Sequence, residues 1–80
     1  MAKYFSEQEI DDLTDCYAYL GQFEDMILRT NNVKMFRFLP DIAKKRLSIA
    51  EMLGWNKECK AIICSDIENY EMKNKEISNN

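Results

Sequence analysis

The residue types that most often carry out chemistry in proteins are scarce in this chain. Its 80 residues include no histidine, which removes the commonest general base, the commonest metal ligand and the usual activator of a serine or cysteine nucleophile. The three cysteines, at positions 16, 59 and 64, are odd in number and lack C-x-x-C spacing, which argues against a disulfide framework and against a zinc site. We therefore expect no metal and no cofactor, and we interpret the cysteines as small buried hydrophobic residues.

Paired carboxylates are the remaining candidates for acid–base chemistry. Asp11 and Asp12 are adjacent, as are Glu24 and Asp25, but a solvated helix face is the simpler interpretation of both pairs. A chain of this length also does not easily enclose a cleft of the size that substrates require. We therefore do not expect an enzyme.

The charges are segregated along the sequence. Residues 1–27 have a net charge of −6, residues 28–50 a net charge of +5 and residues 51–80 a net charge of −2. The acidic and basic segments could lie side by side, which would make the segregation internal, or the basic segment could be an exposed patch that binds an anion or DNA. For the exposed alternative, Lys44, Lys45 and Arg46 are expected largely on the outer face of their helix. The candidate anion or DNA contacts are Lys34, Arg37, Lys44, Lys45, Arg46, Asn56 and Lys57.

The composition favours helices in a single small domain. Two glycines and one proline are too few for the many turns of an all-β fold. We predict an all-α fold, a small three-helix bundle covering residues 1–75, with a frayed tail at 76–80. The chain has no apolar run long enough to span a membrane, and its N-terminus does not resemble a secretion signal, so a cytoplasmic location is expected.

Capping and turn residues delimit the helices. Ser6 followed by Glu9 is a capping box that starts the first helix. Gly54 suits the left-handed position after a helix, and Asn56 is a plausible cap for the helix that follows. The predicted helices cover Ser6 to Arg29, Pro40 to Leu53 and Lys57 to Lys75, with a possible short extra helix at about residues 33–39. On the first helix, the predicted inward stripe is Ile10, Leu13, Tyr17, Leu20 and Ile27, widened by Cys16 and Phe23.

The corner between the second and third helices resembles a helix-turn-helix. In that family a small residue is followed four positions later by glycine and then by apolar residues six and nine positions after the glycine. Ala50, Gly54 and Ile63 match this pattern, whereas the remaining apolar position is Lys60. The resemblance covers about 20 of the 80 residues and implies a DNA-binding regulator that uses residues 47–63. A plain corner between two helices is the other interpretation, because a chain with a pI near 4.9 has few cations for DNA.

Large apolar side chains favour an interaction surface over DNA binding. Phe36, Phe38 and Trp55 flank the basic segment and could anchor a partner. Phe36 and Phe38 could instead enter the core with the short helix, and a core position is favoured for Trp55. The acidic first helix is the second candidate surface, because it could face a basic protein surface. Its candidate contacts are Glu7, Asp11, Asp12 and Asp15.

The function expected from these features is that of a non-enzymatic protein–protein interaction module, either a homodimer or the partner of another protein. In size and composition the chain is similar to small acidic helical proteins of bacteriophages and mobile elements, which often inhibit host nucleic-acid machinery. That similarity implies an inhibitor or accessory protein that binds a host protein. A third hypothesis is an oligomer that sequesters a small phosphorylated ligand.

Overall fold

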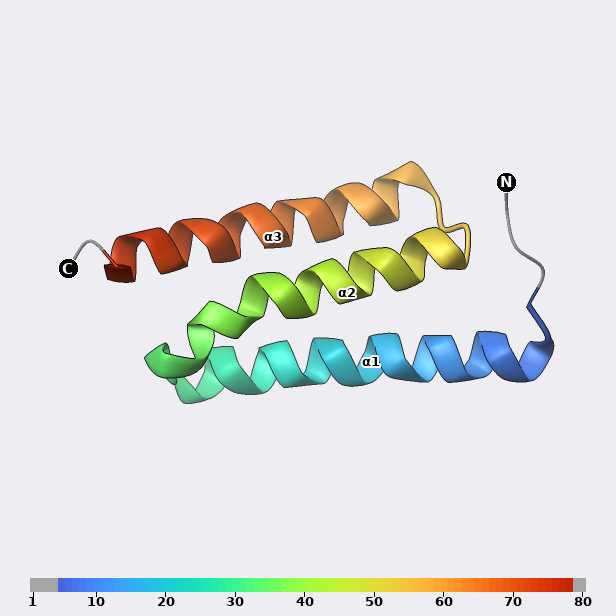
Figure 1. Ribbon diagram of the computed structural model, residues 1–80, viewed down its shortest axis with the longest axis horizontal. Helices are drawn as coiled ribbons and strands as arrows, with labels where there is room; N and C mark the ends of the chain where they lie inside the picture. The colour runs from blue at the N-terminus through green and yellow to red at the C-terminus, as the bar shows by residue number, and fades with distance from the viewer. Residues whose placement is uncertain (1–4, 79–80) are drawn as a thin grey trace.

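Three α-helices and one short 3₁₀ helix follow one another along the chain (Figure 1). The computed structural model describes residues 5–78, with α1 at Glu7–Thr30, η1 at Val33–Phe38, α2 at Leu39–Met52 and α3 at Lys57–Ser78. The predicted all-α fold, a small bundle of three helices, is confirmed. The helix α3 continues through residues 76–78, which the sequence assigned to a frayed tail, and residues 1–4 and 79–80 lie outside the described residues. No helix within residues 5–78 combines the length and apolarity that crossing a bilayer requires.

The ends of the helices follow from local hydrogen bonds. The Glu9 amide donates to Ser6 Oγ at 3.2 Å and the Ser6 amide donates to Glu9 Oε1 at 3.0 Å, which is the predicted capping box. The bond from the Ser6 amide also lowers the pKa of Glu9 below its usual value. Gly54 has a φ of +72°, the left-handed geometry expected after α2. Asn56 Oδ1 accepts from the Cys59 amide at 2.9 Å and so caps α3.

The three helices form a row with α2 in the middle (Figure 1). The molecule measures 47 × 22 × 15 Å, and a width of about 22 Å is what three helices give when their axes lie 8–10 Å apart in a row. The helices α2 and α3 run side by side in opposite directions, as in an αα-hairpin (Figure 1). The two helices of a helix-turn-helix, in contrast, cross at about 90–120°.

Besides the buried residues Ile49, Ala50 and Ile63, the core has a cluster at the end of the molecule where η1 packs against the helices. Its buried members are Ile27, Phe36, Leu39, Ala43 and Tyr70. Phe36 retains only 7% of its exposure, so this side chain takes the core alternative and is not available to anchor a partner. All three cysteines, in contrast, are free and exposed, so their interpretation as buried hydrophobic residues is wrong.

The two glycines give a matched test of the backbone. A Cβ added at Gly21, inside α1, would meet no atom within 4 Å, so Gly21→Ala should stabilise the protein by about 0.5–1 kcal/mol through the entropy of the unfolded chain. Gly54→Ala should destabilise it by about 1–2 kcal/mol, because alanine is strained at positive φ. Urea unfolding followed by circular dichroism measures both, and changes of equal sign would contradict this account.

Candidate interaction surface

A buried ion pair joins the three helices. Arg46 Nε donates to Glu24 Oε2 at 2.5 Å and Arg46 Nη2 donates to Glu24 Oε1 at 2.7 Å. The same Nη2 also donates to Asp66 Oδ2 at 3.1 Å, and the Tyr70 hydroxyl donates to Glu24 Oε1 at 2.7 Å. The side chains of Arg46 and Glu24 are only 9% and 4% exposed. The prediction that Arg46 lies on the outer face of its helix is therefore wrong, because its guanidinium is bound to Glu24.

The surroundings of this ion pair shift the proton affinity of its members. Burial lowers the pKa of Arg46, but the bonds to Glu24 and Asp66 outweigh that effect and hold it above its ordinary value. Burial raises the pKa of Tyr70, and the bond to Glu24 raises it further. No buried side-chain polar atom in the described part of the chain lacks a hydrogen-bond partner. The ion pair is thus fully satisfied within the protein and leaves no buried group there for a ligand.

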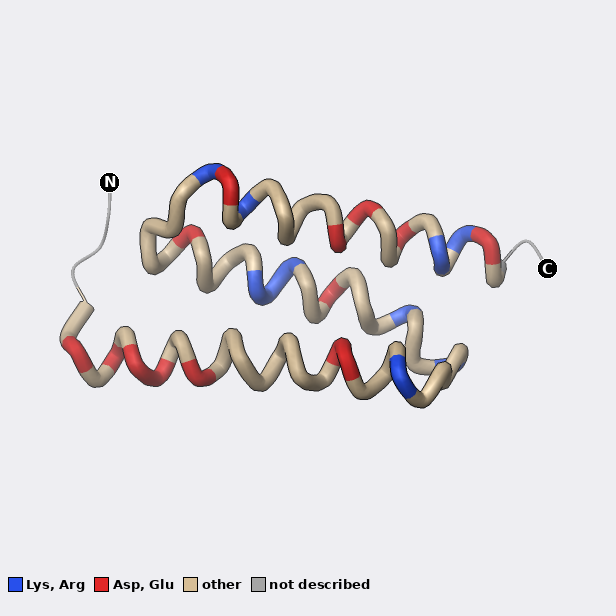
Figure 2. The backbone as a smooth tube through the Cα atoms, turned by 180° about the vertical axis from the view of Figure 1, so that it is seen from behind, with Lys and Arg blue, Asp and Glu red and all other residues tan. Residues whose placement is uncertain are grey.

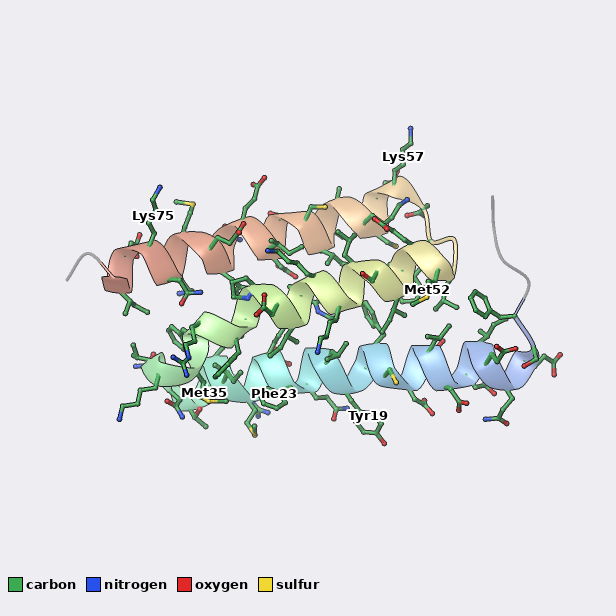
Figure 3. The ribbon with its side chains drawn as sticks, viewed as in Figure 1. Tyr19, Phe23, Met35, Met52, Lys57 and Lys75 are labelled. Atoms are coloured by element: carbon green, nitrogen blue, oxygen red, sulfur yellow. The ribbon has the colours of Figure 1, made fainter. Side chains whose placement is uncertain are left out.

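The predicted basic contacts are dispersed over the molecule (Figure 2). Lys44 pairs with Glu71 at 3.9 Å. Lys34 and Arg37 line a small groove between η1 and α3, and Lys45 faces α1. Two further candidates also lie apart from them, since Asn56 caps α3 and Lys57 extends from its first turn (Figure 3). With Arg46 buried, the seven predicted contacts do not form one anion or DNA surface.

The three predicted aromatic anchors do not form a common patch either. Phe38 is 39% exposed and lies beneath the Arg37 guanidinium, 4.9 Å from the ring centre. Trp55 is half-buried and packs edge-on against Tyr17, with ring centres 4.7 Å apart. Phe36 is in the core, so only Phe38 is open to solvent to any large extent.

The predicted acidic surface is exposed at the N-terminal half of α1. Glu7, Asp11, Asp12 and Asp15 are all solvent-accessible, and these turns of α1 extend beyond the corner between α2 and α3 (Figures 1 and 2). Among residues 5–78, no three acidic, histidine or cysteine side chains gather closely enough to hold a metal ion. The acids therefore present diffuse negative charge at one end of the molecule.

A groove between α1 and α2 is lined mostly by apolar side chains, and the residue pattern of the sequence did not predict it. Its volume is about 530 Å³. Tyr19 is 69% exposed and Phe23 is 42% exposed, and both extend from α1 on the side away from α3 (Figure 3). We call this surface the α1–α2 groove; its lining residues are Cys16, Tyr19, Leu20, Phe23, Lys45, Ser48, Ile49 and Met52.

The spacing of apolar residues on α1 contained a signal for this groove. Cys16, Tyr19 and Phe23, with Met26 (50% exposed), follow one another at intervals of three, four and three residues, which is the spacing of a helix seam. This seam lies about 90° around the helix from Leu20 and the other residues that face α2, since each residue advances by about 100°. Within the described chain, α1 contacts α2, η1 and Tyr70 of α3, whereas Tyr19, Phe23 and Met26 of the seam remain exposed.

Removal of one partner of the ion pair should lower the free energy of unfolding more than replacement of both partners by apolar side chains. Glu24→Gln should lower the free energy of unfolding by about 3 kcal/mol, because it leaves a buried guanidinium without its main partner. The double variant Glu24→Leu/Arg46→Met should recover part of this loss, because buried charges give up hydration that apolar side chains do not; the recovery is incomplete because the buried Tyr70 hydroxyl loses its acceptor. Urea unfolding of the single and double variants tests this, and additive losses would contradict it.

The raised pKa of Tyr70 gives a pH dependence of known sign. The folded state keeps the phenol proton above the ordinary pKa of about 10, so the unfolded state binds fewer protons in that range and stability must fall as the pH rises. We expect the stability of the wild-type protein relative to Tyr70→Phe to fall progressively as the pH rises above about 10. Unfolding curves of both proteins across this range measure the difference, and a constant difference would refute the assignment.

The sequence and the fold were compared with protein-family models, with curated proteins and with solved structures. None of the three comparisons finds a match. The features of the chain that bear on its function are an apolar groove on two helices, an acidic end on one of them, and an internally satisfied ion pair between them.

Proposed function

We propose that this protein is a non-enzymatic interaction module that binds another protein chain through the α1–α2 groove. The observation that carries the proposal is the exposure of Tyr19, Phe23 and Met52 in one continuous apolar surface. Single exposed apolar residues are ordinary, but contiguous patches with aromatic residues are typical of binding surfaces. Tyrosine, phenylalanine and methionine are also enriched in protein interfaces.

The groove is held in a form that suits binding. Its two walls are regular helices, and the ion pair of Arg46 with Glu24 joins them from within. Side chains on a rigid support lose little additional freedom when a partner docks, which leaves more of the contact free energy for affinity. Complete burial of one such aromatic side chain contributes about 1.5–3 kcal/mol.

The acidic end of α1 supports an inhibitory form of this function. Negative charge at one end of an elongated molecule accelerates the approach to a basic surface and orients the encounter. A basic protein surface that normally holds nucleic acid has this chemistry. Occupation of such a surface by Glu7, Asp11, Asp12 and Asp15 would exclude the nucleic acid.

The alternative functions have less support from the arrangement of the basic residues. A DNA-binding regulator or a phosphate-sequestering oligomer needs several cations on one surface. Arg46 is buried against Glu24, and Lys44 lies next to Glu71. The antiparallel α2–α3 corner also differs from the crossed helices of a DNA reader.

Site-specific photocrosslinking in cells of the source organism tests the groove. A crosslinking amino acid at Tyr19 should capture a protein chain, either a second copy or a different protein, and the same probe at Ile62 should not. Ile62 on α3 is the matched control because it is 65% exposed and lies outside the groove. The substitution Phe23→Asp should reduce the Tyr19 product by about 30-fold, the effect of losing about 2 kcal/mol at an interface centre.

Two outcomes would contradict the proposal. Equal capture from Tyr19 and Ile62 would mean that contacts are nonspecific. Undiminished capture after Phe23→Asp, in a protein whose circular dichroism is unchanged, would mean that the partner does not dock in the groove.

A further inference from the structure

We propose that the occupant of the α1–α2 groove is a second copy of this chain, docked with the two α1 helices antiparallel about a twofold axis. The inference rests on the proposed function, because it assumes that the groove binds protein. It goes further in naming the partner and its orientation. Three independent features support it: the layering of the fold, the symmetry of the apolar seam and the placement of charge beside that seam.

The three helices leave the groove side of α1 and α2 without a covering element in the described residues. Stable domains generally bury their apolar faces between two layers. Here the third dimension is 15 Å, and the radius of gyration is 14.0 Å, compared with about 11.6 Å for a compact chain of 80 residues. A second row of helices over the groove would supply the missing layer, and chains this small commonly gain stability through oligomerisation.

The apolar seam on α1 is symmetrical about its own centre. Its members are Cys16, Tyr19, Phe23 and Met26, and their intervals of three, four and three residues are the same in both directions. In an antiparallel pair centred on residue 21, Cys16 lies opposite Met26 of the second copy, and Tyr19 lies opposite Phe23 of the second copy. A twofold interface requires this self-complementarity of a single patch.

Charges beside the seam select the antiparallel orientation. Asp15 and Arg29 are exposed on the edge of the seam that faces away from α2. Their midpoint is residue 22, one residue from the centre of the seam. Antiparallel docking therefore brings Asp15 next to Arg29 of the second copy at both ends, with neutral Gln22 at the axis. In a parallel pair, Asp15 would lie at the same height as Asp15 of the second copy, and Arg29 at the same height as Arg29 of the second copy. The two acidic N-terminal halves would also lie together and repel each other.

The helix α2 lies on one side of this pair and completes the arrangement. Lys45, Ser48 and Met52 line the groove from α2 at helical spacing. In an antiparallel dimer the α2 helices of the two copies lie on the same side of the α1 pair, so the two grooves close on each other as a four-helix bundle. The acidic first turns of α1 then extend from opposite ends of the dimer.

Molar mass in solution is the first test. Light scattering after size-exclusion chromatography should give about 19 kDa, twice the chain's 9.5 kDa, for the wild-type protein and for Ile62→Asp. The variants Phe23→Asp and Tyr19→Asp should each give a monomer with unchanged helicity. Tyr19 is the safer position for folding, because 69% of it is already exposed.

Charge reversal tests the orientation. Asp15→Arg and Arg29→Asp should each weaken the dimer roughly 3- to 10-fold, and the double variant Asp15→Arg/Arg29→Asp should return to wild-type affinity. In a parallel dimer neither single reversal would create a new repulsion, and the double variant would have nothing to restore.

Disulfide formation tests the register. With Cys59 and Cys64 replaced by serine, Cys16 of one copy lies about 15 Å along the helix from Cys16 of the other, beyond the reach of a disulfide. Met26→Cys in that background should give a covalent dimer on mild oxidation, and Ile62→Cys should not. A covalent dimer formed through Cys16 alone would indicate a parallel pair and overturn the proposal.

The possible failures are distinguishable. A wild-type protein that remains monomeric up to about 1 mM, or a dimer that survives both Phe23→Asp and Tyr19→Asp, overturns the second-copy assignment. If Tyr19 then still crosslinks a different protein, the interaction function stands and only the identity of the occupant is wrong. If Tyr19 crosslinks nothing, both proposals fail.

Discussion

The arrangement of the three helices depends on the buried pair of Arg46 and Glu24. Apolar contacts between helices are not directional, so a helix such as α1 could slide or rotate against α2 at little cost. A guanidinium bound to both oxygens of one carboxylate permits only one register. The Tyr70 hydroxyl on the same carboxylate, and Asp66 on the same guanidinium, extend this restriction to α3. Because each buried ion gives up several kcal/mol of hydration, the pair determines the helix register more than it contributes to stability.

This register also decides which surface is left exposed. With Glu24 turned toward Arg46, the residues that share its side of α1 pack on α2, and the seam of Tyr19 and Phe23 is turned about 90° away from that contact. The helix α2 lies between its neighbours and therefore cannot shield both stripes of α1. The rotation of α1 that brings Glu24 to Arg46 is thus the one that leaves Tyr19 and Phe23 in the exposed groove.

Features that depend on neighbours within four residues were predictable from the sequence. The capping box at Ser6, the left-handed Gly54 and the cap at Asn56 lie where they were expected, because each involves hydrogen bonds within one turn. Arg46 was misplaced because its partner Glu24 is 22 residues away, and no local pattern links them. The run of Lys44, Lys45 and Arg46 nevertheless indicated that the three side chains could not all be exposed on one face. Three consecutive helical residues span about 200° of the circumference, so they cannot all occupy one outer face.

The groove was missed for a related reason. Cys16 and Phe23 were assigned to a single wide inward stripe, although a stripe that runs from Phe23 to Ile10 spans about 140° of the helix circumference, which is wider than one neighbouring helix covers. Separation of that stripe into two would have predicted a second contact surface from the residue spacing alone. It would not have identified α2 as the other wall of the groove, since that depends on the register set by Arg46.

The buried pair of Arg46 and Glu24 affects the stability of the protein and the geometry of its exposed groove in different ways. An apolar replacement of Glu24, Arg46 and the Tyr70 hydroxyl can leave the free energy of unfolding nearly unchanged, yet it removes the only bidentate contact that fixes the rotation of α1 within the described residues. The seam of Tyr19 and Phe23 would then be presented over a range of angles, and each partner that docks would have to restore the correct one, which lowers affinity without unfolding the protein. On this argument the ion pair contributes more to the precision of the surface that it supports than to the free energy of unfolding.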